Sequence, residues 1–193
     1  GLADGYFIAP HSISNYLASN KFEDISINHE AFEEATSSTS KFCNQLLDIK
    51  GSNTVDDLHK RLGKIMWNSV GMSRNKEGLE KALKDILALK EEFYNTINIP
   101  GTKEFNAELE KAGRLADFLG LGELMALDAL KRDESCGGHF REEYQTDENE
   151  ALRNDTDFSY VAAWEHKKNV QDSVLHKEDL EFENVKLTNR SYK

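Results

Sequence analysis

The sequence is poor in cysteine, and it contains no long apolar run. Its two cysteines, Cys43 and Cys136, lie far apart, and neither belongs to a Cys-x-x-Cys pair. This spacing predicts neither a zinc site nor a disulfide framework. No stretch is long and apolar enough to cross a bilayer, and no signal peptide is recognisable. The sequence therefore predicts a protein of a reducing, cytoplasmic compartment that is not inserted directly into a membrane.

Basic side chains are also scarce relative to acidic ones. The chain has 24 Lys and Arg against 35 Asp and Glu, which gives a formal net charge of -11 at pH 7. Nucleic acids require a basic binding face, and anionic lipids attract basic segments, so neither partner is predicted. Hydrophobic residues make up 38% of the 193 positions. That content indicates a folded chain of one domain or slightly more, with a modest core.

What the sequence does contain is apolar residues at helical spacing. Thr54 and Asn75 are placed as N-caps of two helices, because their side-chain oxygens can accept bonds from the first turn. Gly120 and Gly122 interrupt another helical pattern and predict a kink. Short connections between such helices favour antiparallel packing, so we expect an up-down bundle of three or four helices. The stretches with apolar residues three or four positions apart are 29–50, 54–70, 75–99 and 105–132.

The two ends of the chain differ from this helical pattern. The first 20 residues are mostly apolar or small and predict a helix bent near Pro10. Near the other end, Phe158–Trp164 and Leu175–Leu187 predict two strands joined by the polar stretch Lys167–Asp172. A basic tail, Thr188–Lys193, follows. The predicted fold class is therefore mainly α, with a small C-terminal antiparallel β-hairpin.

A polar cluster follows the last predicted helix and is the strongest candidate for chemistry. The cluster surrounds Gly137-Gly138 and is open to two interpretations, a helix cap with a solvated charged loop or a site. Cys136 and His139 could ligate a metal, but zinc sites need three or four ligands. A Cys-His nucleophile pair is equally unsupported.

Sequence motifs for cofactor binding and nucleophilic catalysis are missing. There is no G-x-G-x-x-G, no phosphate-binding loop and no G-x-S-x-G elbow. We assign Trp67 and Trp164 to the core or its rim and not to cofactor stacking. The residues by themselves predict an acidic helical bundle without a self-contained active site.

The polar cluster nevertheless resembles a family signature. Arg132-x-Glu134-Ser135-x-Gly137-x-His139-x-Arg141 is similar to the R-x-E-S-R-G-x-H-x-R signature of the flavoprotein subunit of succinate dehydrogenases and fumarate reductases. Cys136 stands where that signature usually has Arg. The likeness continues in order along the chain, through the Trp67–Arg74 turn and the Arg153-Asn154-Asp155 segment. The ending resembles that of the Bacteroides-like branch of fumarate reductases.

The resemblance implies a domain organisation and a set of contact residues. Residues 1–28 would be the terminal helix of a missing FAD-binding domain with its linker. Residues 29–145 would be the helical bundle ending in the polar loop, and residues 146–193 the acidic loop, hairpin and tail. The chain itself looks cut from something longer. The residues implied in contacts with another domain or a partner are Arg132, Glu134, Ser135, His139, Arg141 and Arg153.

The resemblance also implies an activity for the whole subunit. Covalently bound FAD would exchange hydride with succinate or fumarate, and an iron–sulfur subunit and a membrane anchor would link it to quinone. The complex would lie at the inner face of the cell membrane. No catalytic, flavin-binding or metal-binding residue is carried onto this chain, so it would be an inactive scaffold without bound FAD. Its uncovered apolar patch would allow self-association. The alternatives are the C-terminal domain of L-aspartate oxidase and a stand-alone helical interaction module.

Overall fold

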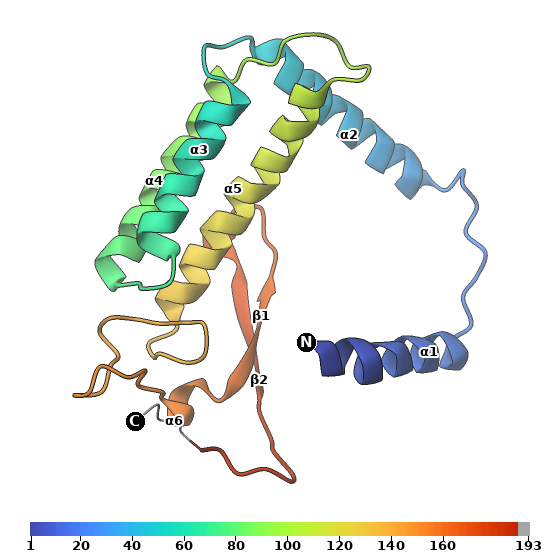
Figure 1. Ribbon diagram of the computed structural model, residues 1–193. Helices are drawn as coiled ribbons and strands as arrows, with labels where there is room; N and C mark the ends of the chain where they lie inside the picture. The colour runs from blue at the N-terminus through green and yellow to red at the C-terminus, as the bar shows by residue number, and fades with distance from the viewer. Residues whose placement is uncertain (189–193) are drawn as a thin grey trace. The chain divides into compact units, whose positions relative to one another are not determined.

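The structure is a computed structural model that describes residues 1–188 (Figure 1). It divides into two compact units, Gly1–Lys41 and the chain from Phe42 onward. The boundary falls inside helix α2 (Glu30–Ile49), close to the predicted stretch 29–50. Except for Thr188, the predicted basic tail lies outside the described residues. None of the described helices is both long enough and apolar enough to cross a membrane.

The first unit is helical but has no core. A π-helical turn, η1 (Asp4–Ile8), leads into α1 (Ala9–Ser19). Pro10 lies in the first turn of α1, directly after this π-helical turn. Every residue of Gly1–Lys41 is exposed, including its large apolar side chains. The helix predicted for residues 1–20 is therefore present, and its ring contact outside the helix, Tyr16 with Phe22 at 5.7 Å between centroids, leaves both rings exposed.

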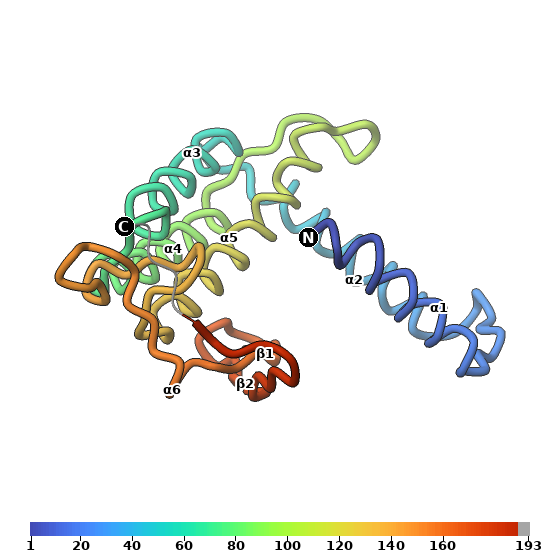
Figure 2. The backbone as a smooth tube through the Cα atoms, turned by 60° about the horizontal axis from the view of Figure 1, so that its bottom comes forward, coloured from blue at the N-terminus to red at the C-terminus, as the bar shows by residue number. Residues whose placement is uncertain are grey.

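The second unit contains the predicted bundle, in which three helices lie side by side (Figures 1 and 2). The predicted caps are confirmed: Thr54 Oγ1 accepts from the Asp57 N–H at 3.2 Å and Asn75 Oδ1 from the Gly78 N–H at 2.8 Å. Each such cap contributes about 1 kcal/mol to stability. The helical elements are α3 (Val55–Ile65), η2 (Met66–Val70), α4 (Lys76–Thr96) and α5 (Ala107–Lys131).

One continuous apolar core joins these helices to the end of α2. Fully buried side chains from each helix meet there, such as Leu46, Leu58, Ile86 and Leu119. Gly120 and Gly122 do not interrupt the helix, because α5 is α-helical from Ala107 to Lys131. Gly122 instead allows close packing: a Cβ there would lie 3.1 Å from Met66 Sδ.

The predicted C-terminal hairpin is present but shorter than expected. Strand β1 (Tyr160–Glu165) pairs antiparallel with β2 (Val174–Asp179), and Tyr160 lies opposite Asp179. β2 ends at Asp179 and not at Leu187: the Leu180 N–H still donates to the Ser159 carbonyl at 3.0 Å, but the chain before Ser159 is the helix α6 and offers no strand to pair with. A short helix, α6 (Asp155–Phe158), precedes β1, and a 3-10 turn, η3 (Val170–Asp172), lies within the predicted polar connection.

The two tryptophans occupy different environments. Trp164 is partly buried and donates from Nε1 to Asp128 Oδ1 at 2.7 Å, which fastens the hairpin to α5. Trp67 is 84% exposed, so its predicted place in the core or rim is wrong. It belongs to the π-helical turn η2.

Candidate functional site: the polar loop after helix α5

The polar loop, residues 132–144, turns sharply after α5. Gly137 has a φ of +59°, a conformation that glycine adopts without steric cost. On either side of it, the Cys136 N–H donates to the His139 carbonyl at 2.8 Å, and the His139 N–H donates to the Cys136 carbonyl at 3.0 Å. The turn therefore brings the backbones of Cys136 and His139 together through two hydrogen bonds, neither of which involves a side chain. Nothing in the structure explains why Cys136 replaces the usual Arg.

Arg141 is buried beneath the loop and caps α5. Its side chain is 1% exposed. Nη1 donates to the Ala129 carbonyl at 3.0 Å and lies 3.4 Å and 3.5 Å from the Leu130 and Arg132 carbonyls. Nε donates to Glu143 Oε2 at 3.2 Å. The last carbonyls of a helix have no partner within it and carry its negative end. A buried guanidinium there satisfies these carbonyls and is itself stabilised.

Ser135 holds the two sides of the loop together. It is fully buried, and its Oγ accepts from the Arg141 N–H at 2.8 Å while donating to the Arg141 carbonyl at 3.1 Å. Its own N–H donates to the Leu152 carbonyl at 2.9 Å. Ser135 therefore fixes the backbone of Arg141, so that the guanidinium can reach the end of α5.

Glu134 and Arg132 join the loop to the hairpin. Glu134 is 2% exposed; its Oε1 accepts from Arg132 Nε at 2.8 Å and its Oε2 from the Asn154 N–H at 2.9 Å. Arg132 Nη2 donates to the Phe158 carbonyl at 2.9 Å. The Arg132 guanidinium also lies over the Phe158 and Tyr160 rings, at 5.7 Å and 5.6 Å from their centroids. Both oxygens of the buried Glu134 carboxylate therefore accept hydrogen bonds.

His139 is held as a neutral imidazole. Arg74 Nη1 lies 2.9 Å from its Nδ1, and the Arg132 carbonyl lies 2.9 Å from its Nε2. Because arginine only donates, Nδ1 accepts and Nε2 carries the proton. Burial lowers the pKa of His139, and the nearby charges of Arg74, Arg141 and Arg132 lower it further, against the opposing effect of its bond to the Arg132 carbonyl.

A metal site at Cys136 and His139 is not supported. Both ring nitrogens of His139 already have partners. Among residues 1–188, no group of three or more His, Cys, Asp or Glu side chains is arranged to hold a metal ion.

The loop also rests on the start of α4, which sequence reasoning missed. Glu142 accepts from Ser73 Oγ and Asn75 Nδ2, each at 2.8 Å, and these bonds lower the pKa of Glu142. Glu143 accepts from the Lys76 N–H. Carboxylates at a helix N-terminus are favourable because they meet its unpaired N–H groups. Nothing local in the sequence pairs positions 142 and 75; only the predicted N-cap at Asn75 pointed to this place.

Five of the six predicted contact residues therefore meet in one network, and Arg153 lies beside it. Arg153 makes a bidentate ion pair with Asp155, with Nη2 2.6 Å from Oδ2, and donates to the Thr188 carbonyl at 3.1 Å. Its neighbour Asn154 reaches Glu134. Contacts of these residues with another domain or partner remain a prediction.

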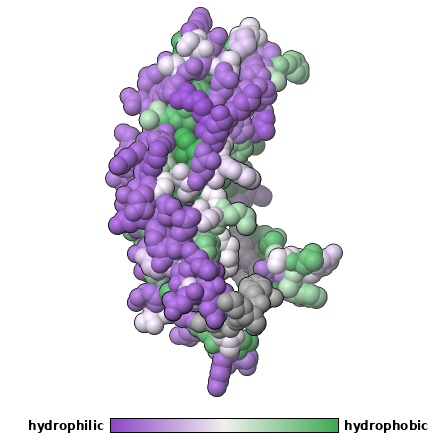
Figure 3. Space-filling model, turned by 60° about the vertical axis from the view of Figure 1, so that its left-hand side comes forward, coloured by the Kyte–Doolittle hydropathy of each residue, from purple (hydrophilic) through white to green (hydrophobic). Residues whose placement is uncertain are grey.

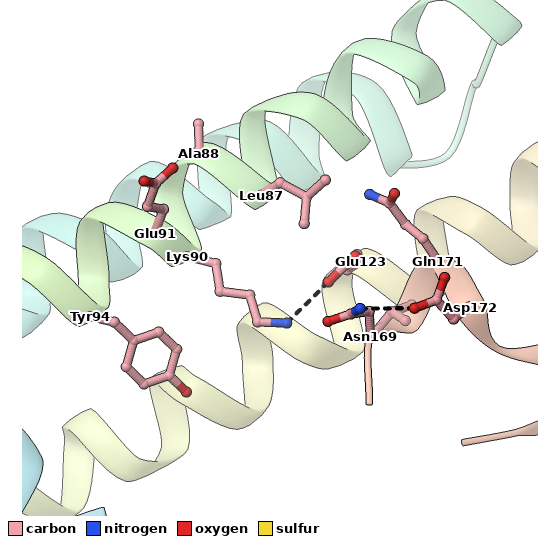
Figure 4. A pocket seen from close by; sticks show the side chains of 10 residues that line it. Leu87, Ala88, Lys90, Glu91, Tyr94, Glu123, Asn169, Gln171 and Asp172 are labelled. Atoms are coloured by element: carbon pink, nitrogen blue, oxygen red, sulfur yellow. Dashed lines mark hydrogen bonds and ion pairs between the residues drawn. The ribbon is translucent and has the colours of Figure 1, made fainter. Parts of the chain in front are cut away.

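A separate polar pocket of about 600 Å³ lies between α4, α5 and η3 (Figure 4). Lys90 Nζ points across it to Glu123 Oε2 at 3.2 Å, and Glu123 is 1% exposed. On the other side, Asn169 Nδ2 donates to Asp172 Oδ2 at 2.8 Å. The lining also includes Glu91. Carboxylates outnumber the single ammonium group in this pocket.

Known structures share this arrangement of bundle, loop and hairpin. The quinol fumarate reductase subunit FrdA of Escherichia coli superposes with a TM-score of 0.73 at 21% identity, over 93% of this chain and 29% of that one. Sdh1 of Mycobacterium smegmatis gives 0.70 at 21% identity, over 90% of this chain and 28% of that one. At this level of identity the likeness shows the fold alone.

Sequence comparison then identifies the family. Residues 59–192 match the family described as fumarate reductase flavoprotein C-term. The fumarate reductase flavoprotein subunit of Helicobacter pylori is 30% identical over 158 residues, which are 81% of this chain and 22% of that protein. An uncharacterized FAD-dependent oxidoreductase of Methanocaldococcus jannaschii is 28% identical over 71% of this chain and 23% of its own length.

The chain belongs to this family and is the C-terminal domain of a flavoprotein of the fumarate reductase and succinate dehydrogenase class. The predicted resemblance and the predicted fold class are both confirmed. The chain spans less than a quarter of the length of these two relatives. Its placement in a Bacteroides-like branch remains a prediction.

The pocket between α4, α5 and η3 does not fit FAD. The dinucleotide has a negatively charged pyrophosphate, which glycine-rich turns and helix N-termini bind in other proteins. The pocket between α4, α5 and η3 offers Lys90 against the carboxylates of Glu91, Glu123 and Asp172, and Lys90 is already paired with Glu123. No step of flavin chemistry is assigned to these side chains.

Proposed function

We propose that this chain is the structural C-terminal domain of a flavoprotein subunit that interconverts succinate and fumarate, and that it performs no chemistry itself. The observation that carries the proposal is the use of the signature residues. Arg141 and Glu134 are almost completely buried, and their bonds go to the end of α5 and to the hairpin segment. Groups engaged in this way stabilise a fold and are unavailable for substrate.

The relatives support the rest of the proposal. The Helicobacter pylori relative is a fumarate reductase flavoprotein subunit, the Methanocaldococcus jannaschii relative is FAD-dependent, and the Escherichia coli structure is a quinol fumarate reductase. In the complete protein, FAD is bound by the part outside this chain. Electrons pass through an iron–sulfur subunit to a membrane anchor and quinone, and the flavoprotein lies on the inner face of the cell membrane without inserting into it.

The first unit supports the proposed domain division. Tyr6, Ile13 and Leu17 are each more than half exposed, and their spacing of seven and four positions places them on one face of the η1–α1 stretch. The apolar face of a helix is normally buried, and a helix this short is marginal without packing. Residues 1–28 therefore act as the terminal helix and linker of the FAD-binding domain. Residues 29–145 form the bundle with its loop, and residues 146–193 the remaining C-terminal segment.

The predicted contact residues would act in docking, five of the six by holding the polar loop rigid. Arg132, Glu134, Ser135, His139 and Arg141 fix the loop from inside. The turn at Gly137–Gly138 is left exposed. This turn, with Arg153 beside it, is the part available to another domain or subunit. Isolated from its partners, the chain would self-associate through its uncovered apolar residues.

The test compares the complete flavoprotein with this chain expressed separately. The complete protein is expected to carry flavin and to oxidise succinate or reduce fumarate, whereas the separate chain elutes from gel filtration without flavin absorbance. Oxidation of L-aspartate in place of succinate would favour the L-aspartate oxidase alternative. Flavin that co-elutes with the separate chain would contradict the scaffold role. A complete gene product without a flavin-binding part would favour the stand-alone module.

A further inference from the structure

Helix α5 is apolar on two sides, and only one of them faces the core. On the core side, Leu115 and Leu119 are fully buried. On a second side, Phe118, Leu121 and Met125 are 39%, 55% and 44% exposed. These three residues recur at intervals of three and four positions, so they share one face of the helix. A surface helix ordinarily carries polar residues there, and an apolar second face indicates that something covers it.

This second face forms one wall of an apolar groove, which we call the α3/α5 groove. The groove encloses about 210 Å³, and its other wall is made by His59, Gly63 and Met66. The rings of His59 and Phe118 lie 5.4 Å apart across it. Gly122 lies in the groove and admits the Met66 sulfur, so the two walls are close together without a side chain between them.

Two further features mark the groove as a contact surface. The wall from α3 ends in the π-helix η2, and π-helical turns are frequent at functional sites. Trp67, beside Met66, is 84% exposed, and exposed tryptophan is typical of interface anchors. Methionine at Met66 and Met125 suits a surface that adapts to a partner.

Another face of the bundle is charged. The outer face of α4 carries charged side chains such as Lys84 and the Lys81–Asp85 ion pair. The side of the molecule drawn in Figure 3 is likewise mostly hydrophilic. The groove therefore differs from the charged outer face of α4.

We propose that the α3/α5 groove is the docking surface for the flavin-binding part of the same polypeptide, which precedes residue 1 in the complete protein. The family matched is a C-terminal one, and the relatives extend over four times the length of the aligned region. Most of the polypeptide therefore lies on the N-terminal side of this domain. A covalently tethered partner acts at a high effective concentration and covers such a patch before a separate molecule does. The inference rests on the proposed function, because it requires this longer polypeptide.

The test measures access to the groove by cysteine labelling. Leu121→Cys and the matched control Lys84→Cys, on the polar face of α4, are made in the complete flavoprotein polypeptide purified without other subunits, and in this chain separately. Maleimide labelling of each peptide is followed by mass spectrometry. We expect Leu121→Cys to label at least ~10-fold more slowly in the complete polypeptide than in the separate chain, because burial of the site limits reagent access. Lys84→Cys should label equally fast in both.

Three results would overturn the inference. Equal labelling of Leu121→Cys in both proteins would show that nothing covers the groove in the complete polypeptide. Protection that arises only on adding the iron–sulfur subunit would assign the groove to that subunit. Protection already present in the separate chain, and increasing with its concentration, would assign it to a second copy.

Two additional measurements keep the outcome clear. If Leu121→Cys fails to fold, hydroxyl-radical oxidation of Met125 in the unmodified proteins gives the same comparison, with slower oxidation expected in the complete polypeptide. Flavin absorbance of the same sample tests the proposed function separately: absence of flavin contradicts that function, whereas the labelling ratio still decides the groove.

Discussion

The polar loop and the first unit make opposite use of their side chains. The loop, residues 132–144, buries charged groups, and Arg141 and Glu134 have partners on every side. The first unit, Gly1–Lys41, exposes apolar groups such as Phe7 and Tyr16 and buries none. The comparison teaches that the loop is completed by contacts within its own domain, whereas the first unit depends on contacts from elsewhere. The predictions below test that difference, beginning with the largest expected effect.

Removal of the buried guanidinium should break the loop. Arg141→Ala removes a donor from the Ala129, Leu130 and Arg132 carbonyls, of which the last also accepts from His139, and it removes the guanidinium partner of Glu143. Loss of one partner from a buried charged network costs about 3–5 kcal/mol. Urea denaturation of the chain measures this loss. The exposed pair Arg114–Glu110 provides the control, since Arg114→Ala should cost no more than ~1 kcal/mol. Equal losses in the two variants would mean that burial gives Arg141 no special role.

Ser135→Ala should have an intermediate effect. The variant removes a fully buried hydroxyl that both accepts from and donates to the Arg141 backbone. A buried polar group left without its partner costs about 1–3 kcal/mol. The same denaturation experiment applies, with Ser73→Ala as the control because Ser73 is exposed and bonds to Glu142. A loss no larger than that of the control would show that the loop keeps its shape without Ser135.

The cap at the start of α4 should contribute less. Asn75→Ala removes the acceptor for the Gly78 N–H and the donor to Glu142. The expected loss is about 1 kcal/mol. Asn75→Asp separates the two roles, because it retains the acceptor but places a second carboxylate beside Glu142. If Asn75→Asp is as stable as the wild type, the contact with Glu142 contributes nothing measurable.

Acid should weaken the loop through His139. Its pKa is lowered in the folded protein, chiefly by burial, so the folded state binds a proton less readily than the unfolded chain. Stability contributed by the neutral ring is therefore present above the unfolded pKa of about 6.5 and declines as the pH falls below it. Unfolding free energies at several values between pH 7.5 and 5 should fall more steeply for the wild type than for His139→Gln. Parallel curves would contradict a neutral His139 in the folded state.

Local sequence signals predicted the fold well. The caps at Thr54 and Asn75 depend on a side chain and an N–H only three residues away, and the helices follow from apolar spacing. Glycine was harder to interpret, because spacing cannot distinguish a kink from close packing. At Gly122 the close approach of the Met66 sulfur explains the glycine, and Met66 lies 56 positions earlier in the chain.

The sequence predicted which residues belong to the site but not which contacts they make. The signature indicated that Arg132, His139 and Arg141 belong together. It could not indicate that His139 accepts from Arg74, since that pair is separated by 65 positions. The strand that ends at Asp179 shows the same limit, because its length depends on its partner and not on its own apolar residues.

Hydrogen exchange of the separate chain tests the central claim most directly. The claim is that the polar loop is complete within its own domain and that α1 is not. Amides of Arg141 and Ser135, which bond to Ser135 Oγ and to the Leu152 carbonyl, should be protected to nearly the same degree as the core of α5. Amides of α1, Ala9–Ser19, should exchange close to the rate of an unfolded chain. Strong protection of α1 in the separate chain, or a loop that exchanges as fast as α1, would contradict the account.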